Sequence, residues 1–210
     1  MVSDIDENRE WVKLKKNQPT DEELIARFQD GDNYAFDQIV RRYKDQLLNF
    51  IFRYINDTSE AEDIVQETFF RVYRHKHYYR EIAKFPTWIY TIASNLAKTE
   101  LRRRKRRNFF SINDDTYKEK EINIKNKMNN PEQDVNSTVT ENVIQNAINK
   151  LSPKFRQVII LRDIQGFSYE EISVIIRVPL GTVKSRVNRA RIKLQEDLNF
   201  LLNDLEYSSN

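Results

Sequence analysis

The stretch GFSYEEISVIIRVPLGTVKSRVNRARIKL, residues 166–194, decides the fold because it has the pattern of a helix-turn-helix. Ser168 and Glu171 are spaced as a capping box, which predicts where a first helix begins. Pro179 disfavours helix at the residue before it and suits the first turn of a second helix. Three isoleucines give the first helix one inward stripe: Ile172, Ile175 and Ile176.

The second helix of this pattern is apolar on one side and cationic on the other. Its apolar residues recur at Val183, Val187, Ala190 and Leu194. The other side carries Lys184, Ser185, Arg186, Asn188, Arg189, Arg191 and Lys193. A helix of this width fits the DNA major groove, where Arg and Lys can donate to guanine and Asn can pair with adenine. The pattern favours duplex DNA over the alternative, a solvated basic helix on an ordinary bundle.

The composition indicates an all-α protein. The chain has 210 residues, and three glycines and five prolines are too few for the many turns of an all-β fold. No cysteine is present, which excludes disulfides and thiolate metal sites, and His75 and His77 are expected at the surface. We therefore expect no metal and no cofactor. No apolar run reaches the ~20 residues that span a bilayer, and the acidic N-terminus does not resemble a signal peptide, so we expect an intracellular protein.

Apolar periodicity predicts several helices before residue 108. A short helix begins at Thr20, with Glu23 as its capping-box partner, and a long helix follows until the Asn-Asp-Thr at 56–58. A third helix is expected to begin with a capping box of Ser59 and Glu62. Opposite its apolar stripe lies a polar face, and the default interpretation is that this face is simply exposed to solvent: Glu62, Asp63, Gln66 and Glu67.

Residues 74–84 lose the helical period and contain Tyr78 and Tyr79 among His, Lys and Arg. Aromatic rings between cations suit single-stranded nucleic acid, since bases stack on rings while cations hold phosphates. Both tyrosines could equally pack against the bundle. A further helix starts at Phe85 and ends in six consecutive cations at 102–107. Such a block favours a polyanion over a loose basic tail, because it continues a packed helix.

The pattern therefore divides the chain into two small helical domains joined by a flexible linker. We expect a mobile N-terminal extension at 1–19, a first domain at 20–107, a linker at 108–138, a helix-turn-helix domain at 139–203 and a tail at 204–210. The linker is rich in Asn, Asp, Glu and Lys and has no apolar period.

Three motifs in this order resemble the extracytoplasmic-function (ECF) sigma factors, the small two-domain initiation subunits of bacterial RNA polymerase. AEDIVQETFFRVYR at 61–74 is similar to their helix that binds core polymerase. FPTWIYTIASNLAKTELRRRKR at 85–106 is similar to their −10 and promoter-melting helix. The segments at 151–172 and 178–191 are similar to their −35 reader.

The resemblance implies a role for each group of residues. Glu62, Asp63, Gln66 and Glu67 would dock on the polymerase β′ coiled coil, and the β subunit is a further expected contact. The single-stranded −10 element would meet Tyr78, Tyr79, Trp88, Asn95, Arg102, Arg103, Arg104 and Arg106, with a flipped base captured at 74–84. The duplex −35 element would meet Thr182, Lys184, Ser185, Arg186, Asn188, Arg189 and Arg191, of which Arg186 and Arg191 would hold phosphates.

The resemblance also implies a cytoplasmic protein without membrane insertion, held inactive by an anti-sigma factor that is often membrane-bound. Two positions depart from the family pattern. Thr99, with Glu100 beside it, stands where the family has Asp, so a carboxylate contact is expected to be lost or shifted. Arg177 stands where the helix-turn-helix usually has Gly or Asn, which would cost energy if φ is positive there.

Two other classes of function remain as alternatives. A conventional helix-turn-helix regulator would dimerise and bind a palindrome without polymerase. A metal-dependent nuclease would need a third ligand beside Asp63 and Glu67, and no such residue converges on them in the sequence.

Overall fold

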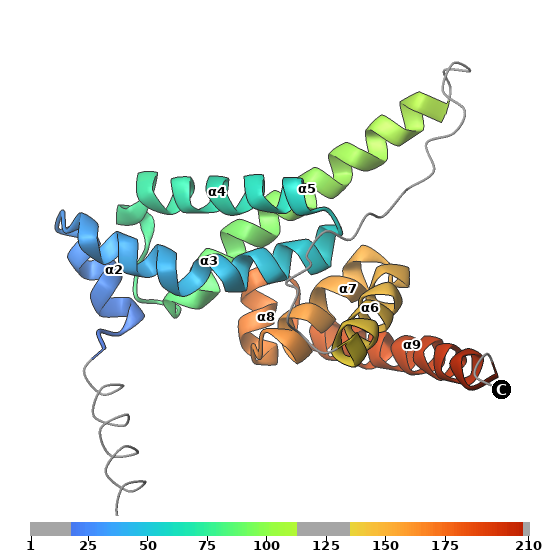
Figure 1. Ribbon diagram of the computed structural model, residues 1–210. Coiled ribbons are helices and arrows are strands. Elements are labelled where there is room, and N and C mark those ends of the chain that lie inside the picture. Colours follow the sequence, from blue (N-terminus) through green and yellow to red (C-terminus); the bar gives the residue numbers. More distant parts are fainter. Residues whose placement is uncertain (1–17, 113–134, 208–210) are drawn as a thin grey trace, which may run out of the picture.

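The computed structural model describes residues 18–112 and 135–207, and every regular element in these ranges is a helix. Figure 1 shows the N-terminal elements above the C-terminal ones. The elements are α2 (Asp21–Gln29), α3 (Asn33–Ile55), α4 (Thr58–Arg74), η1 (Lys76–Tyr78), α5 (Phe85–Ile112), α6 (Val135–Lys150), α7 (Pro153–Ile159), η2 (Ile160–Ile164), α8 (Tyr169–Ile176) and α9 (Leu180–Tyr207). The predicted all-α class with a C-terminal helix-turn-helix is confirmed.

Side-chain caps decide where the N-terminal helices begin. The capping box of Thr20 and Glu23 is present at the start of α2, as predicted. The predicted box of Ser59 and Glu62 is wrong, because α4 begins earlier. Asp57 caps it by accepting a hydrogen bond from the Glu60 N–H at 3.0 Å. A carboxylate two residues upstream of Ser59 competes successfully for the free N–H groups of the first turn.

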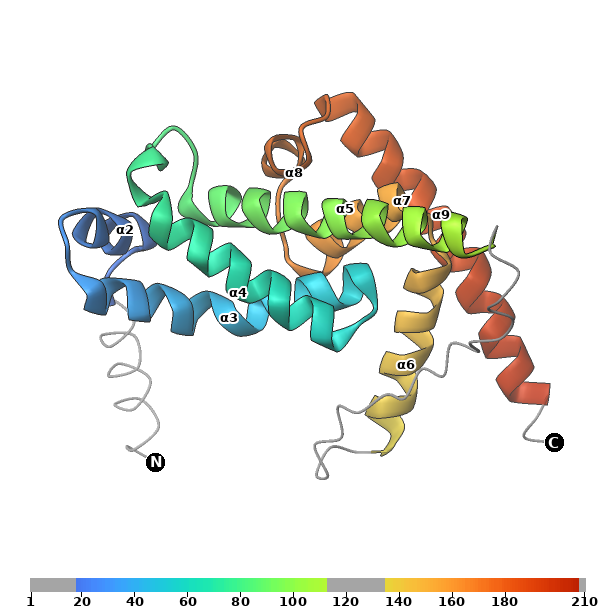
Figure 2. The same cartoon turned by 90° about the horizontal axis from the view of Figure 1, so that it is seen from above.

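Helix α5 lies at the centre of the molecule. Figure 2 shows α3 and α4 on one side of it and α8 on the other, while α9 begins on the side of α8 and crosses α5. Its buried residues Phe85, Ile89 and Ala93 join the core of the N-terminal helices. Because a helix turns every 3.6 residues, other positions of α5 are left to face its other neighbours.

The C-terminal helices form the predicted helix-turn-helix. Ser168 and Glu171 make the expected capping box at the start of α8. Val183, Val187 and Ala190 of α9 are buried, which confirms the inward stripe of the second helix. Before this motif, α7 passes directly into the π-helical turn η2.

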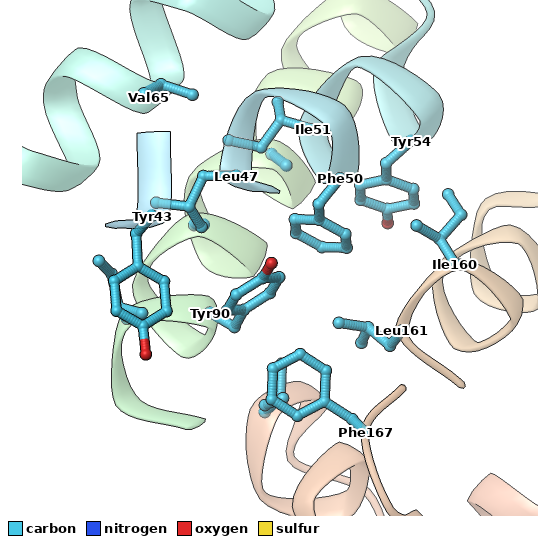
Figure 3. Packing of buried hydrophobic residues seen from close by; sticks show 14 of the residues in the cluster. Tyr43, Leu47, Phe50, Ile51, Tyr54, Val65, Tyr90, Ile160, Leu161 and Phe167 are labelled. Atoms are coloured by element: carbon cyan, nitrogen blue, oxygen red, sulfur yellow. The ribbon is translucent and has the colours of Figure 1, made fainter. Parts of the chain in front are cut away.

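The two halves share one continuous apolar core, which the sequence did not predict. Figure 3 shows Tyr90 of α5 between Phe50 of α3 and Phe167 of the C-terminal half. The ring centroids of Tyr90 and Phe167 are 4.7 Å apart, and those of Tyr90 and Phe50 are 5.3 Å apart. Burial raises the pKa of the Tyr90 hydroxyl, which stays protonated and donates to Gln165 Oε1 at 2.6 Å.

Polar contacts add to this interface between the halves. The Arg156 guanidinium donates to the Tyr54 carbonyl at 3.0 Å, near the end of α3, and to the Leu151 carbonyl at 3.2 Å, just after α6. A cation at two helix C-termini is favourable because both ends carry partial negative charge. Lys98 of α5 likewise donates to the Ile176 carbonyl at the end of α8, at 3.2 Å.

The predicted linker at 108–138 is too long at both ends. Helix α5 continues to Ile112, and α6 already begins at Val135. Helix α9 continues to Tyr207, well into the predicted tail. The expectations for residues 1–17, 113–134 and 208–210 lie outside the described residues.

The turn of the helix-turn-helix places Arg177 in the left-handed region, with φ 56° and ψ 55°. The Val178 N–H donates to the Ser173 carbonyl at 3.2 Å, which closes the end of α8 in the manner of a Schellman motif. Residues with a β-carbon pay a steric cost in this conformation, and Asn pays less than most.

Replacing Arg177 tests this backbone strain. We expect Arg177→Asn to raise the free energy of unfolding by about 0.5–1 kcal/mol relative to Arg177→Ala, since both variants lose the same charge and only Asn favours φ > 0. Urea denaturation monitored by circular dichroism measures both variants. Equal stability of the two would show that the turn carries no such strain.

Candidate nucleic-acid interface

The exposed face of α4 carries four polar residues opposite its buried stripe. Glu62, Asp63 and Gln66 are exposed, and Glu67 is half-buried. Glu67 Oε1 lies 2.7 Å from Arg71 Nε, one turn further along the helix. Glu62 and Asp63 make no ion pair within the described ranges, so this face of α4 is acidic and exposed.

A cavity of about 530 Å³ lies where α4, η1 and α5 meet. This volume falls in the range of small-molecule sites. The structure brings together here three of the residues predicted for the −10 element: Tyr78, Trp88 and Asn95. The other lining residues are Glu67, Phe70, Arg71, Arg74, His75 and Ile92.

The two neighbouring tyrosines differ in exposure. Tyr78 is 77% exposed at the cavity, whereas Tyr79 is only 7% exposed and packs on Phe85 and Trp88. Burial raises the pKa of Tyr79 to about 12, and its hydroxyl donates to the Ala83 carbonyl at 3.0 Å. The prediction that Tyr79 offers a stacking surface is therefore wrong in this conformation, because its ring belongs to the core.

Phe70 lines the cavity, although the sequence did not predict it as a site residue. It is 56% exposed although Phe69 beside it is buried. Its position in the sequence could have indicated this role. Phe70 lies one residue off the apolar stripe of α4, where an aromatic ring has no packing role in the core. Arg71 and Arg74 add two cations to the same wall of the cavity.

The cationic end of α5 is divided between two faces. Arg103 and Arg104 form ion pairs with acids of α4 and α5, so the prediction that they are free for nucleic acid does not hold in this conformation. Among the described residues, no acid pairs with Arg102, Lys105 or Arg106. These three cations remain available to a polyanion.

Neither Thr99 nor the neighbouring Glu100 places a carboxylate at the cavity. The Thr99 hydroxyl donates to the Asn95 carbonyl at 2.9 Å. The Glu100 side chain is buried and paired with arginines. The expected carboxylate contact is therefore replaced by an ion-pair cluster on another face of α5.

The second helix of the helix-turn-helix keeps its polar face open. Lys184, Ser185, Asn188 and Arg189 are exposed, and Thr182 and Arg186 are partly exposed. The Ser185 hydroxyl donates to the Thr182 carbonyl at 3.0 Å. Arg191 is paired with Asp163, with Nε and Oδ2 3.1 Å apart. In this conformation it is therefore not free for the phosphate contact that the sequence predicts.

Cations from the two halves converge beside the end of α8. Burial lowers the pKa of the Lys98 ammonium, and nearby Arg102, Arg186 and Arg177 act in the same direction. This repulsion opposes the apolar contact between the halves. The molecule thus has two cationic surfaces that meet, with an aromatic cavity beside one of them.

Among residues 18–112 and 135–207, no helix is long and apolar enough to cross a membrane. In the same residues, no three His, Asp or Glu side chains are placed to hold a metal ion together. Within the part of the chain that the structure describes, no third ligand of the kind that the nuclease alternative requires joins Asp63 and Glu67.

Two family models match the chain in order. Residues 39–107 match Sigma-70 region 2, and residues 141–194 match Sigma-70, region 4. The chain is 35% identical over 190 residues to the RNA polymerase sigma-H factor of Pseudomonas aeruginosa, covering 89% of this chain and 98% of the relative. It is 36% identical over 176 residues to the ECF RNA polymerase sigma-E factor of Escherichia coli, covering 83% and 92%.

Two solved structures share the fold. One is the sigma factor RpoE of Bartonella quintana in complex with the anti-sigma factor NepR, with a TM-score of 0.60 and 30% identity over 78% of this chain and 96% of that one. The other is CnrH in complex with the cytosolic domain of CnrY, with a TM-score of 0.61 and 22% identity over 84% and 95%.

The contrast between the two tyrosines predicts different costs of truncation. We expect Tyr79→Ala to lower the free energy of unfolding by about 3 kcal/mol, because it removes a buried ring. Tyr78→Ala should change it by less than about 0.5 kcal/mol, because its ring is exposed. Urea denaturation compares the matched pair. A similar loss in both variants would contradict this assignment of core and surface.

Proposed function

The chain belongs to the extracytoplasmic-function sigma factors, and from that premise we propose that it binds core RNA polymerase and selects the promoters at which transcription begins. It would perform no bond chemistry itself. One observation carries the proposal: a single chain joins a helix that can read duplex DNA to an aromatic cavity that can hold an unpaired base. Family membership does not support the alternative of a polymerase-independent dimeric regulator.

We propose that α9 reads the −35 element in the major groove. Lys184, Ser185, Asn188 and Arg189 are exposed on its outward face, where cations and amides can reach base edges. Arg186 would hold a phosphate, and Arg191 would do so only by exchanging Asp163 for it. Thr182 supports this face through its hydrogen bond with Ser185.

The α4–α5 cavity is proposed to capture a base of the −10 strand. Tyr78, Phe70 and Trp88 offer rings for stacking, and Asn95 offers an amide for the base edge. Flipping a base out of the duplex costs a few kcal/mol, which such contacts can offset. Arg102 and Arg106 would hold the adjoining phosphates.

The acidic surface of α4 is proposed to dock on the β′ coiled coil of polymerase, where basic residues would face Glu62, Asp63 and Gln66. Glu67 is shared between this surface and the cavity, and its pairing with Arg71 limits its availability. An anti-sigma factor is a further proposed partner, since solved relatives are bound to such proteins. We place the protein in the cytoplasm, with membrane tethering only through that partner.

The proposed function requires the two halves to separate. The −35 and −10 elements are centred about 25 base pairs apart by their names, which is about 85 Å of duplex at ~3.4 Å per base pair. A compact chain of this length has a radius of gyration of only about 17 Å. The packed arrangement of Tyr90 on Phe167 is thus the state before promoter binding.

Charge reversal tests the docking surface. We expect Asp63→Lys to reduce co-purification with core polymerase by about 10-fold or more, because like charges across an interface cost several kcal/mol. Asp37→Lys makes the same charge change at an exposed site on α3 and should retain binding. If both variants retain normal binding, polymerase docks elsewhere.

Gel-shift assays test promoter recognition. Specific binding to a duplex promoter should require core polymerase, and Lys184→Ala or Arg189→Ala should weaken it by about 1–3 kcal/mol per lost base contact. Lys44→Ala removes an exposed cation from α3, outside the recognition helix, and serves as the control. Tight promoter-specific binding without polymerase would instead favour the dimeric regulator.

A further inference from the structure

Glu100 stands immediately before the cationic block of α5 and is only 8% exposed. Three arginines gather around its carboxylate. Arg103 Nε lies 2.7 Å from it, Arg107 Nη2 lies 3.1 Å from it, and Arg104 Nε lies 3.4 Å from it. Positions 100, 103, 104 and 107 form one stripe of the helix, so these contacts follow from helical spacing.

Glu60 of α4 and Asp57, the residue that caps this helix, complete the cluster. Glu60 Oε1 lies 3.5 Å from Arg103 Nη2, and Asp57 Oδ2 lies 3.2 Å from Arg104 Nη2. Arg104 also donates to the Ile55 carbonyl at 3.4 Å, at the end of α3. The cluster therefore ties the cationic end of α5 to the junction between α3 and α4.

In these pairings the Glu100 carboxylate is buried, whereas the Arg103 and Arg107 side chains that bind it are more than half exposed. An exposed pair contributes little and exchanges readily. A buried carboxylate left without cations is strongly destabilising, so Glu100 must keep its arginines. Arg102, Lys105 and Arg106 belong to other positions of the same helix, and no acid of the described residues holds them.

We propose that Glu100 is a specificity-determining positioning residue that withholds Arg103, Arg104 and Arg107 from nucleic acid. Phosphate contacts then fall on Arg102, Lys105 and Arg106 in a fixed register. This inference rests on the proposed function only in that the end of α5 meets DNA. Each extra cation that reaches a phosphate strengthens binding to any sequence, so withholding three of six cations preserves the preference for a promoter.

The salt dependence of binding counts phosphate contacts directly. For duplex DNA the slope of log K against log salt concentration steepens by about 0.9 per neutralised phosphate. We expect Glu100→Gln in the full-length chain to steepen the slope on a random-sequence duplex by about 1–3, and to raise affinity about 10-fold or more at low salt. Asp37→Asn adds the same charge at an exposed site and should leave the slope unchanged.

Arginine variants separate positioning from bulk charge. Arg106→Gln should reduce the slope by about 0.9 in the wild-type chain. Arg103→Gln should leave it unchanged there, and should reduce it only in the Glu100→Gln background. Glu100→Asp keeps the charge and should restore most of the wild-type slope, whereas a purely packing role for Glu100 would leave Asp as disruptive as Gln.

The outcomes also distinguish the two proposals. Equal slope changes for Glu100→Gln and Asp37→Asn, or equal losses for Arg103→Gln and Arg106→Gln in the wild-type chain, would overturn the role of Glu100. If Glu100→Gln does not fold, the comparison of the two arginine variants still decides. An Arg106→Gln slope equal to that of the wild type would instead remove the end of α5 from the DNA interface.

Discussion

The whole arrangement depends on α5, a single helix whose sides are committed to different neighbours. Phe85, Ile89 and Ala93 hold it in the N-terminal core. Other positions of α5 line the cavity. Tyr90 and Lys98 contact the C-terminal half, and Glu100 binds arginines of the same helix. Because the burial of one side fixes the rotation of the helix, the other sides are fixed with it. Core packing thus sets the register in which the cavity and the free cations are presented.

The same constraint links the two halves of the chain. Tyr90 packs on Phe167 and donates to Gln165, while Lys98 lies among cations from both halves. Apolar burial favours the contact, and like-charge repulsion opposes it. An interface with these opposing contributions is suited to opening when DNA phosphates or a polymerase surface offer the cations better partners. The family resemblance of each half to a sigma region fits modules that engage DNA separately.

Short-range patterns in the sequence were sufficient for most of the helices and for the helix-turn-helix. The boxes at Thr20 and Ser168 formed as predicted, because a capping box involves only neighbouring residues. The sequence did not indicate which of Tyr78 and Tyr79 is exposed and which is buried, because residues outside a regular helix have no periodicity that assigns them to a side. The ion pairs of Arg103 and Arg104 depend on Asp57 and Glu60 of another helix, which spacing along the chain does not reveal. The contact between the halves was unpredicted for the same reason.

Run-off transcription with core polymerase, followed by mapping of start sites on genomic fragments, tests the central claim most directly. The account predicts that the chain added to core polymerase produces discrete transcripts, with start sites that share a −35 and a −10 sequence. It also predicts that Lys184→Ala shifts the preferred −35 sequence and that replacing Tyr78 and Trp88 blocks opening while −35 binding persists. Initiation that is random, or identical with and without the chain, would contradict the account.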